Sequence, residues 1–271
     1  MAEWKTHTIS SWNALIRYVD AFNIAKPSAL AYVFRGQSDA NWSLQHSLAR
    51  LLPDNITGSD AVNVEDFVTN EFHKQVNLFA DTGGVDRRDL PYYWMFMQHH
   101  GAATRILDWT SSPFVALYFA VREHPKRDAA IYVLHRGHLA AESLARCGED
   151  YTIIDKREFH RWSQLFRTPW KDMLWSLGIT RNFERAAVQQ GMFTISSNVL
   201  VNHGDAISDI LSDSDPGIAT HNKLVVPAEL KPRFLQCLRQ MNITPNSLFP
   251  GLDGLCMGLS DLAYIESRPD E

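Results

Sequence analysis

The stretch HHGAATRILDWTSSPFVALYFAV, residues 99–121, carries the clearest strand-to-helix signal in the chain. Residues 104–108 predict a strand. Ser112-Pro113 predicts the start of a helix, because proline at the first helical position lacks only an N–H that the helix does not need. The apolar residues of that helix recur at helical spacing and are Phe114, Leu117, Tyr118 and Val121. Ala116 and Ala120 on the same helix are small, so we expect the helix to pack closely on a sheet.

Helix and strand patterns interleave outward from this stretch. Helical patterns occupy residues 12–19 (before Pro27), 64–79, 92–97 and 232–241, with a turn and short helix within 39–55. Strand patterns occupy residues 31–34, 129–134, 191–196 and 222–226. Residues 81–84 predict a polar loop, 142–175 predict helices around one strand at 151–154, and 203–216 predict a flexible insertion. Because no regular parallel βαβ rhythm appears, the order favours the α+β class.

Composition and charge are those of an ordinary globular protein. The 271 residues are 45% hydrophobic and 21% charged, and the formal net charge is −5. This mild acidity excludes coating of nucleic acid through bulk positive charge, although it allows a local basic groove. The three cysteines lie far apart, so neither a disulfide framework nor a metal site is expected. The start lacks a signal-peptide core and no apolar run reaches about 18 residues, so we expect a cytoplasmic protein without a membrane partner.

The first candidate for chemistry is Arg35-Gly36, at the end of the predicted strand at 31–34. An arginine that leaves a buried strand can bind a phosphate or carboxylate with two hydrogen bonds, and the glycine lets a ligand approach the backbone. The structural alternative is an arginine paired with an acidic residue at the sheet edge.

A second set of candidates follows the strand at 104–108. Thr110 and Ser111 offer hydroxyls and N–H groups at a helix N-terminus, which suits a phosphate or a ribose. Trp109 can stack on a flat ring, and Asp108 can bind ligand. The structural alternatives are capping of the helix, which we favour for Ser112, and pairing of Asp108 with Arg105 or with loop amides.

His99 and His100 end the predicted helix at 92–97. Either can act as an acid or a base, because the pKa of histidine lies near neutrality. The structural alternative places one ring inward as a hydrogen-bonding partner and the other in water. No further histidine or carboxylate stands at ligand spacing, so a metal site is not expected.

A third set lies in residues 182–194. Glu184 belongs to a helical piece, and Gln189-Gln190 stand directly before the strand at 191–196, where a Glu or Gln can hold sugar hydroxyls. The structural alternative for Glu184 is a solvent-exposed side chain that binds no ligand. The chain lacks the GxSxG, Walker, HExxH and GxGxxG motifs in a suitable context, which removes support for the hydrolases, NTPases and dehydrogenases that carry them.

Together these segments resemble the FRG domain family, whose name is the tripeptide at residues 34–36. The stretch at residues 99–121 resembles the most characteristic part of that family, and QQGMFT (189–194) and NSLFPGLDGL (246–255) also look like family features. The resemblance runs from about Tyr32 to Leu259, so it covers nearly the whole chain.

The layout also resembles, more distantly, the ADP-ribosyltransferases of the Arg-Ser-Glu type. That resemblance implies a mixed or antiparallel split sheet flanked by helices, and NAD as the substrate. It implies that Arg35 binds the diphosphate of NAD and that Thr110 or Ser111 positions the nicotinamide ribose. A Gln or Glu of the third set would then bind the ribose hydroxyl or orient the acceptor.

The chain departs from that family where a catalytic carboxylate is expected. Neither Glu-x-Glu nor Gln-x-Glu occurs, and Gln189-Gln190 provide no carboxylate. Glu184 can take the place of that group if its segment folds back, and Asp108 or a histidine such as His100 is the alternative.

The leading hypothesis is an NAD-dependent ADP-ribosyltransferase that acts as a toxin or a phage-defence effector. Its acceptor would be an RNA or DNA base, on which Trp42, Trp94 or Trp109 can stack, or a protein side chain. An antitoxin or immunity protein would be a partner. We expect residues 1–30 to form an N-terminal helix on the core, residues 31–265 a single domain, and residues 266–271 a frayed tail.

Two other hypotheses belong to different classes. The first is a metal-independent nuclease or other hydrolase that uses His99, His100 and Asp108. The second is a module in which Arg35 and the turn at 110–112 bind a nucleotide without converting it.

Overall fold

The structure is a computed structural model that describes residues 4–23, 32–79, 86–147, 161, 165–167, 172–178, 188–212, 220–249 and 251–267. Its strands are β1 (Lys5–Thr8), β2 (Tyr32–Gln37), β3 (Ile106–Thr110), β4 (Ala129–His135), β5 (Leu174–Gly178), β6 (Gly191–Ser196) and β7 (His221–Val226). The α-helices within those ranges are α1 (Trp12–Asn23), α2 (Gly58–Gln75), α3 (Leu90–His99), α4 (Pro113–Val121), α5 (Arg136–Cys147), α9 (His203–Ile210), α10 (Lys231–Gln240), α11 (Pro245–Leu248) and α12 (Leu252–Glu266). Short 3-10 helices are η1 (Ala49–Leu51), η2 (Val76–Leu78) and η3 (Ala228–Leu230).

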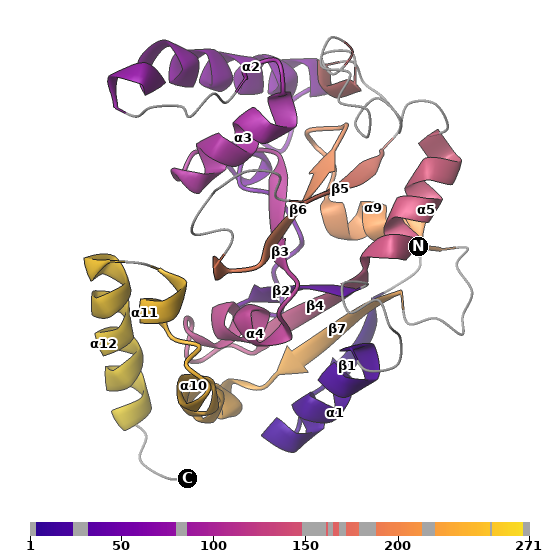
Figure 1. Cartoon of the computed structure of the whole chain (residues 1–271). Helices are drawn as coiled ribbons and strands as arrows, with labels where there is room; N and C mark the ends of the chain where they lie inside the picture. Colours follow the sequence, from indigo (N-terminus) through magenta and orange to yellow (C-terminus); the bar gives the residue numbers. More distant parts are fainter. Residues whose placement is uncertain are drawn as a thin grey trace.

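The seven strands form one mixed sheet in the order β1-β7-β4-β2-β3-β6-β5. Only β1 and β7 run parallel among these neighbours, and the other pairs are antiparallel. Helices cover the sheet (Figure 1). The predicted α+β class with a mixed sheet flanked by helices is therefore confirmed.

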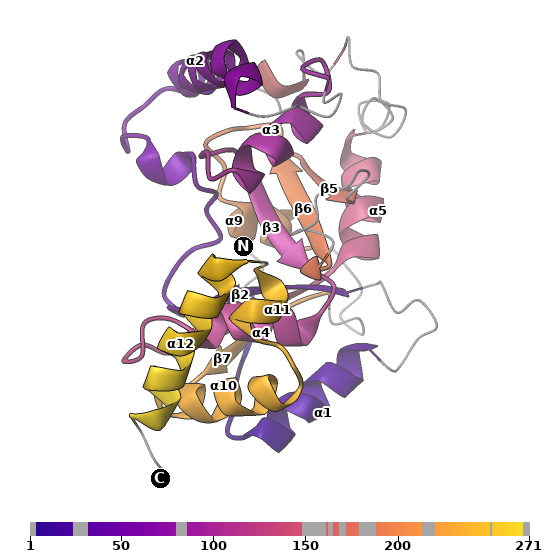
Figure 2. The ribbon, with the colours of Figure 1, turned by 60° about the vertical axis from the view of Figure 1, so that its left-hand side comes forward.

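The sheet consists of two blocks that barely touch. Strands β2 and β3 are paired at a single position, Phe34 with Thr110, whereas β2 and β4 share six paired positions. One block is thus β1-β7-β4-β2 and the other is β3-β6-β5. Figures 1 and 2 show that the strands of the two blocks run in clearly different directions. This weak junction leaves room between the blocks for the cleft described below.

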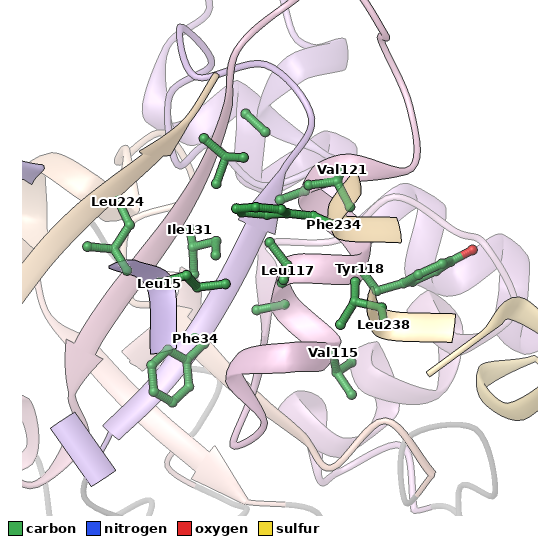
Figure 3. Close-up of a cluster of buried hydrophobic side chains, with 14 of the residues drawn as sticks. Leu15, Phe34, Val115, Leu117, Tyr118, Val121, Ile131, Leu224, Phe234 and Leu238 are labelled. Atoms are coloured by element: carbon green, nitrogen blue, oxygen red, sulfur yellow. The ribbon is translucent and has the colours of Figure 1, made fainter. Parts of the chain in front are cut away.

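The lower block in Figure 1 packs α1, α4 and α10 on one face and α5 with α9 on the other. Strand β4 shows why, because its side chains alternate between the two faces. Ala129, Ile131 and Val133 belong to the first cluster, and Ala130, Tyr132 and Leu134 belong to the second. Figure 3 shows the first cluster, in which Leu117 of α4 and Phe234 of α10 lie beside Ile131.

A glycine sets how closely α4 approaches this block. A Cβ atom at Gly36 would lie 1.9 Å from the carbonyl oxygen of Ala116 and 2.7 Å from the backbone nitrogen of Ala120. The two alanines predicted to allow close packing are both fully buried, so the expected approach of helix to sheet is confirmed.

Helices α2 and α3 pack on the second block and cover a hydrophobic cluster that includes Trp94, Phe166 and Ile195. A buried ion pair joins α2 to the start of β3, because Arg105 donates from Nε to Glu65 at 2.8 Å. The alternative in which Arg105 pairs with Asp108 is therefore wrong. Arg105 is fully buried and directed to Glu65 and to the carbonyl groups of Phe166, Ser196 and Ser197.

The expected flexible insertion at 203–216 is wrong for its first half. Helix α9 begins after an Asn202 cap, whose side chain accepts from the N–H groups of Gly204 and Asp205. Its apolar residues Ala206, Ile207 and Ile210 are buried against β5 and α5. Polar neighbours hide this stripe in the sequence. Residues 213–219 lie outside the described ranges, as do the predicted strand at 151–154, the loop at 81–84 and the end of the chain after 267.

Two strands and the last two helices, α11 and α12, were not expected. Strand β1 pairs with β7 although its sequence, KTHT, is polar, so the first 30 residues contribute an edge strand as well as the expected helix. Strand β5 and the C-terminal α12 were also missed. In the described ranges, no helix is both long enough and apolar enough to span a membrane.

Candidate functional site

A cleft of about 830 Å³ lies at the junction of the two sheet blocks. The end of β2, the strand β3, the helices α3 and α4, the loop that follows β2 and the turn before β6 all contribute to its lining. Among the lining residues are Arg35, Gln98, His99, Asp108, Thr110 and Gln189. The structure therefore brings members of the three sets of candidates, far apart in sequence, into one cleft. No group of His, Cys, Asp or Glu in the described part of the chain is arranged to hold a metal ion.

Arg35 bridges the two blocks. Its side chain is 18% exposed, and Nη1 donates to the backbone carbonyl of Asp108 at 2.7 Å. The carboxylate of Asp108 is 3.9 Å away, so the ion pair is loose. Burial lowers the pKa of Arg35, and the nearby Asp108 opposes that shift. Because the buried Nε has no hydrogen-bond partner among the described residues, the guanidinium retains capacity to bind an anion in the cleft.

Gly36 lines the same cleft, but its missing side chain serves another purpose than the expected one. The space beside its Cα is filled by the backbone of Ala116, not left open for a ligand. Close approach of α4 is thus the reason for a glycine here, and the interpretation as a ligand-approach residue is corrected.

Asp108 is the carboxylate nearest to Arg35. Its side chain is 59% exposed, because β3 directs position 108 to the face opposite the buried Leu107 and Trp109. Gln98 of α3 holds the carboxylate by donating from Nε2 to Oδ1 at 2.7 Å, and its own Oε1 accepts from the hydroxyl of Thr104. The orientation of Asp108 is therefore fixed by a short relay of side chains.

Two of the three candidate segments are tied together at the end of β3. The hydroxyl of Thr110 donates to the carbonyl of Gln189 at 2.7 Å and accepts from the N–H of Ser112 at 3.0 Å. Ser111 Oγ donates to Oε1 of Gln190 at 3.0 Å. These contacts follow from the β3–β6 register, which pairs Thr110 with Gly191. Thr110 thus lines the cleft in a fixed orientation.

Not every residue of this corner lines the cleft. Gln189 does, with its Nε2 donating to the carbonyl of Leu248 at 3.2 Å, but Ser111 and Gln190 are not among the lining residues. Gln190 adopts φ of 49° in the turn before β6. Ser112 caps α4 by accepting from the N–H of Val115 at 3.3 Å, as favoured above. Ser111 and Gln190 are thus turn residues in this structure.

The two neighbouring histidines, His99 and His100, line different hollows of the molecule. His99 lines the cleft, whereas His100, at the end of α3, lines a second hollow of about 530 Å³ with Phe67, Phe72 and Phe79. Their rings are nearly perpendicular, in an edge-to-face arrangement with centroids 5.0 Å apart. A mechanism that needs both rings at one substrate does not fit this arrangement, and His100 is corrected as a catalytic candidate for the cleft.

The tryptophans considered for stacking differ in exposure. Trp94 and Trp109 are 1% and 3% exposed, and Trp109 donates from Nε1 to the hydroxyl of Thr194 at 3.0 Å. Trp109 borders the cleft, but its ring belongs to the core, so stacking on a ligand is corrected to packing. Trp42 is 43% exposed and lines the cleft.

Glu184 lies outside the described residues. Several lining residues were not candidates from the sequence, among them Gln37, Gln98, Arg50 and Glu123. Gln98 stands directly before the histidine pair and could have been considered with it. Arg50 and Glu123 lie in no motif, so only the folded chain brings them to the cleft.

The fold and the site together define the class of this protein: an α+β domain with a split sheet and an arginine-lined cleft. Residues 30–129 match the family model of the FRG domain. That range includes Arg35, Asp108 and Thr110, whereas the QQGMFT and NSLFPGLDGL segments lie outside it. No curated protein and no solved structure matches the chain.

Proposed function

We propose that this protein is an ADP-ribosyltransferase that cleaves NAD in the cleft and transfers ADP-ribose to a macromolecule. The observation that carries the proposal is the convergence of Arg35, Thr110 and Gln189 in one cleft. The resemblance to transferases of the Arg-Ser-Glu type assigns Arg35 to the diphosphate of NAD, Thr110 or Ser111 to the nicotinamide ribose, and a Gln or Glu of the third set to a ribose hydroxyl or the acceptor. Their order along the chain is kept, and one hydrogen bond joins Thr110 to Gln189.

The chemistry asked of this cleft is mostly positioning and charge stabilisation. The bond between C1′ of the ribose and the nicotinamide nitrogen breaks, and nicotinamide leaves with the electron pair. The acceptor then forms a bond to C1′ and gives up a proton. The ribose passes through an oxocarbenium-like state, which nearby negative charge stabilises.

Each lining group suits one part of this reaction. Arg35 would bind the diphosphate, because its unpartnered Nε leaves a donor for a phosphate oxygen. Thr110 would position the nicotinamide ribose, and the Gln189 side chain would bind a ribose hydroxyl or orient the acceptor. Asp108 would replace the catalytic carboxylate of the Glu-x-Glu or Gln-x-Glu motif, which this chain lacks. Gln98 holds the Asp108 carboxylate in the cleft.

The test is release of nicotinamide from labelled NAD and transfer of label to RNA, DNA and protein acceptors. Arg35→Ala should lower kcat/KM for NAD by about 10- to 100-fold, because a charge-assisted hydrogen bond to the diphosphate is worth about 1.5–3 kcal/mol. Asp108→Asn should lower the rate without weakening NAD binding. Arg146→Ala is the matched control, because Arg146 also pairs with an aspartate, Asp209, but lies outside the cleft.

The other hypotheses give different results in the same assay. Nucleotide binding without nicotinamide release identifies a binding module. RNA cleavage without NAD that depends on His99 identifies a hydrolase. Nicotinamide release that is equal in the wild type and in Arg35→Ala contradicts the proposal.

A further inference from the structure

The loop after β2 is held rigidly at the edge of the cleft. Four of its backbone carbonyls accept hydrogen bonds from side chains of other elements: Ser38 from Lys231, Ala40 from Lys223, Trp42 from Tyr132 and Ser43 from Gln37. Donor–acceptor distances are 2.6 to 3.2 Å. A loop fixed in this way presents its outward side chains at little entropic cost to binding.

The side chain that this loop presents is an indole. Trp42 is the one exposed tryptophan in the described part of the chain, and it lines the cleft. His124 packs against it in a T-shaped arrangement, with ring centroids 5.1 Å apart. The Trp42 ring is partly exposed to the cleft, and hydrogen bonds hold the backbone that carries it. Such a ring is suited to stack on a flat ligand ring.

A second arginine lies at the same side of the cleft. Arg50, in η1, lines it, and the positive charge of Arg50 contributes to the lowered pKa of Arg35. Two like charges that approach each other in one cleft favour a ligand with more than one negative charge. A diphosphate has that property.

Gln37 adds an unsatisfied acceptor. Its side chain is 6% exposed, and Nε2 donates to Ser43, which fixes the amide. The amide oxygen is buried and has no hydrogen-bond partner among the described residues, although Gln37 lines the cleft. Because buried polar atoms are usually hydrogen-bonded, this oxygen marks a place where a ligand donor is expected.

These groups lie in a defined order along β2. Thr110 is opposite Phe34 at the junction of the blocks, Arg35 follows, and Gln37 lies three residues beyond Phe34, about 10 Å along the strand. The Trp42 loop is anchored at the Gln37 end. The order along the cleft is therefore Thr110, then the arginines, then Gln37 and Trp42.

We infer that Gln37, Trp42 and Arg50 form the subsite for the adenosine half of a dinucleotide. Trp42 stacks on the adenine ring, Gln37 accepts from a ribose hydroxyl or from the adenine amino group, and Arg50 joins Arg35 on the diphosphate. The assignment rests on the proposed function for its direction, since Thr110 would position the nicotinamide ribose at the opposite end.

The experiment measures binding by calorimetry, with AMP, ADP-ribose and nicotinamide mononucleotide as separate ligands. Trp42→Ala should weaken AMP and ADP-ribose binding by about 5- to 100-fold, the range for loss of one aromatic–base stack. Trp42→Phe should keep most of that affinity. Arg50→Ala should weaken ADP-ribose more than AMP, because AMP lacks the second phosphate.

Two controls separate the subsite from general effects. Nicotinamide mononucleotide lacks the adenosine half, so its binding should be unchanged in Trp42→Ala. Phe67→Ala removes an exposed aromatic ring of α2 that lies outside the cleft, and it should leave all three affinities unchanged.

The outcomes distinguish this inference from the proposed function. Trp42-dependent AMP binding without nicotinamide release supports the subsite and contradicts the transferase. Nicotinamide release with the same KM for NAD in wild type and Trp42→Ala overturns the subsite alone. If Trp42→Ala weakens only the binding of a single-stranded oligonucleotide, the ring serves a nucleic-acid acceptor and the inference is also overturned.

Discussion

At the residue scale, the site depends on side chains whose neighbours fix them. Asp108 is held by Gln98, and Thr110 is held by Gln189 and Ser112. Both Asp108 and Thr110 belong to β3 and line the cleft. Preorganisation of this kind lowers the entropic cost of orienting a substrate.

Gly36 gives a prediction about stability at this scale. Gly36→Ala should lower the free energy of unfolding by about 1–3 kcal/mol or more, since the new methyl group meets helix backbone that cannot rotate away. Urea denaturation measures the effect. Gly58→Ala is the matched control, because nothing lies within 4 Å of a Cβ there. It should change stability by less than about 1 kcal/mol, in the stabilising direction. Equal effects of the two substitutions would contradict the packing argument.

Residues with a strong local signal could be assigned to their elements from the sequence. Their partners from distant parts of the chain could not be predicted. Pro113 and the Ser112 cap were predicted correctly because both act within one turn of their helix. The partner of Arg105 was not, because Glu65 lies 40 residues away and belongs to a helix of another layer. Arg50 and Trp42 similarly reach the cleft only through the fold of their loop.

At the element scale, the loop after β2 and helix α9 meet through a pair of buried histidines. The rings of His46 and His203 are 5.6 Å apart, edge to face. Nδ1 of His46 accepts from the N–H of Ala49, so Nε2 carries the proton and donates to Val199 at 2.8 Å. Burial lowers the pKa of His46 to about 4, and burial also lowers that of His203. Both rings are neutral in the fold.

This pair predicts loss of stability in acid. Between the ordinary pKa of 6.5 and the folded value of about 4 for His46, only the unfolded chain binds the proton. Stability is therefore full above pH 6.5 and falls as the pH decreases, by about 1.4 kcal/mol per pH unit for each such histidine. Urea midpoints at pH 7, 6 and 5 measure it. His46→Gln should reduce the slope by the share of one histidine, and an unchanged slope would contradict the assignment.

Helices and strands with a regular pattern of apolar residues could be predicted from the sequence, and those without one could not. Strand β4 alternates between two buried faces, and its limits were predicted within a residue. Strand β1 could not be predicted, because KTHT has no apolar face and is a strand only through its pairing with β7. Helix α9 was missed because a polar stretch with three buried apolar positions resembles a loop when its packing surface is unknown.

At the scale of the whole molecule, the proposed activity predicts an effect on cells. A protein that modifies an essential macromolecule should arrest growth when its expression is induced in a bacterial host. Arg35→Ala should relieve the arrest, and Arg146→Ala should not. Colony counts after induction, with expression checked by immunoblot, measure the difference. Arrest that persists in a well-expressed Arg35→Ala protein would contradict an NAD-dependent toxin.

The single contact between β2 and β3 has a mechanical consequence for the molecule. Bending the sheet between β2 and β3 disrupts one paired position. Bending it between any other two neighbouring strands disrupts at least four. The sheet therefore has its lowest stiffness where the cleft lies, and the side chain of Arg35 is a cross-brace from one block to the other. A ligand that binds residues of both blocks adds further braces, so occupancy of the cleft and rigidity of the sheet are coupled by construction.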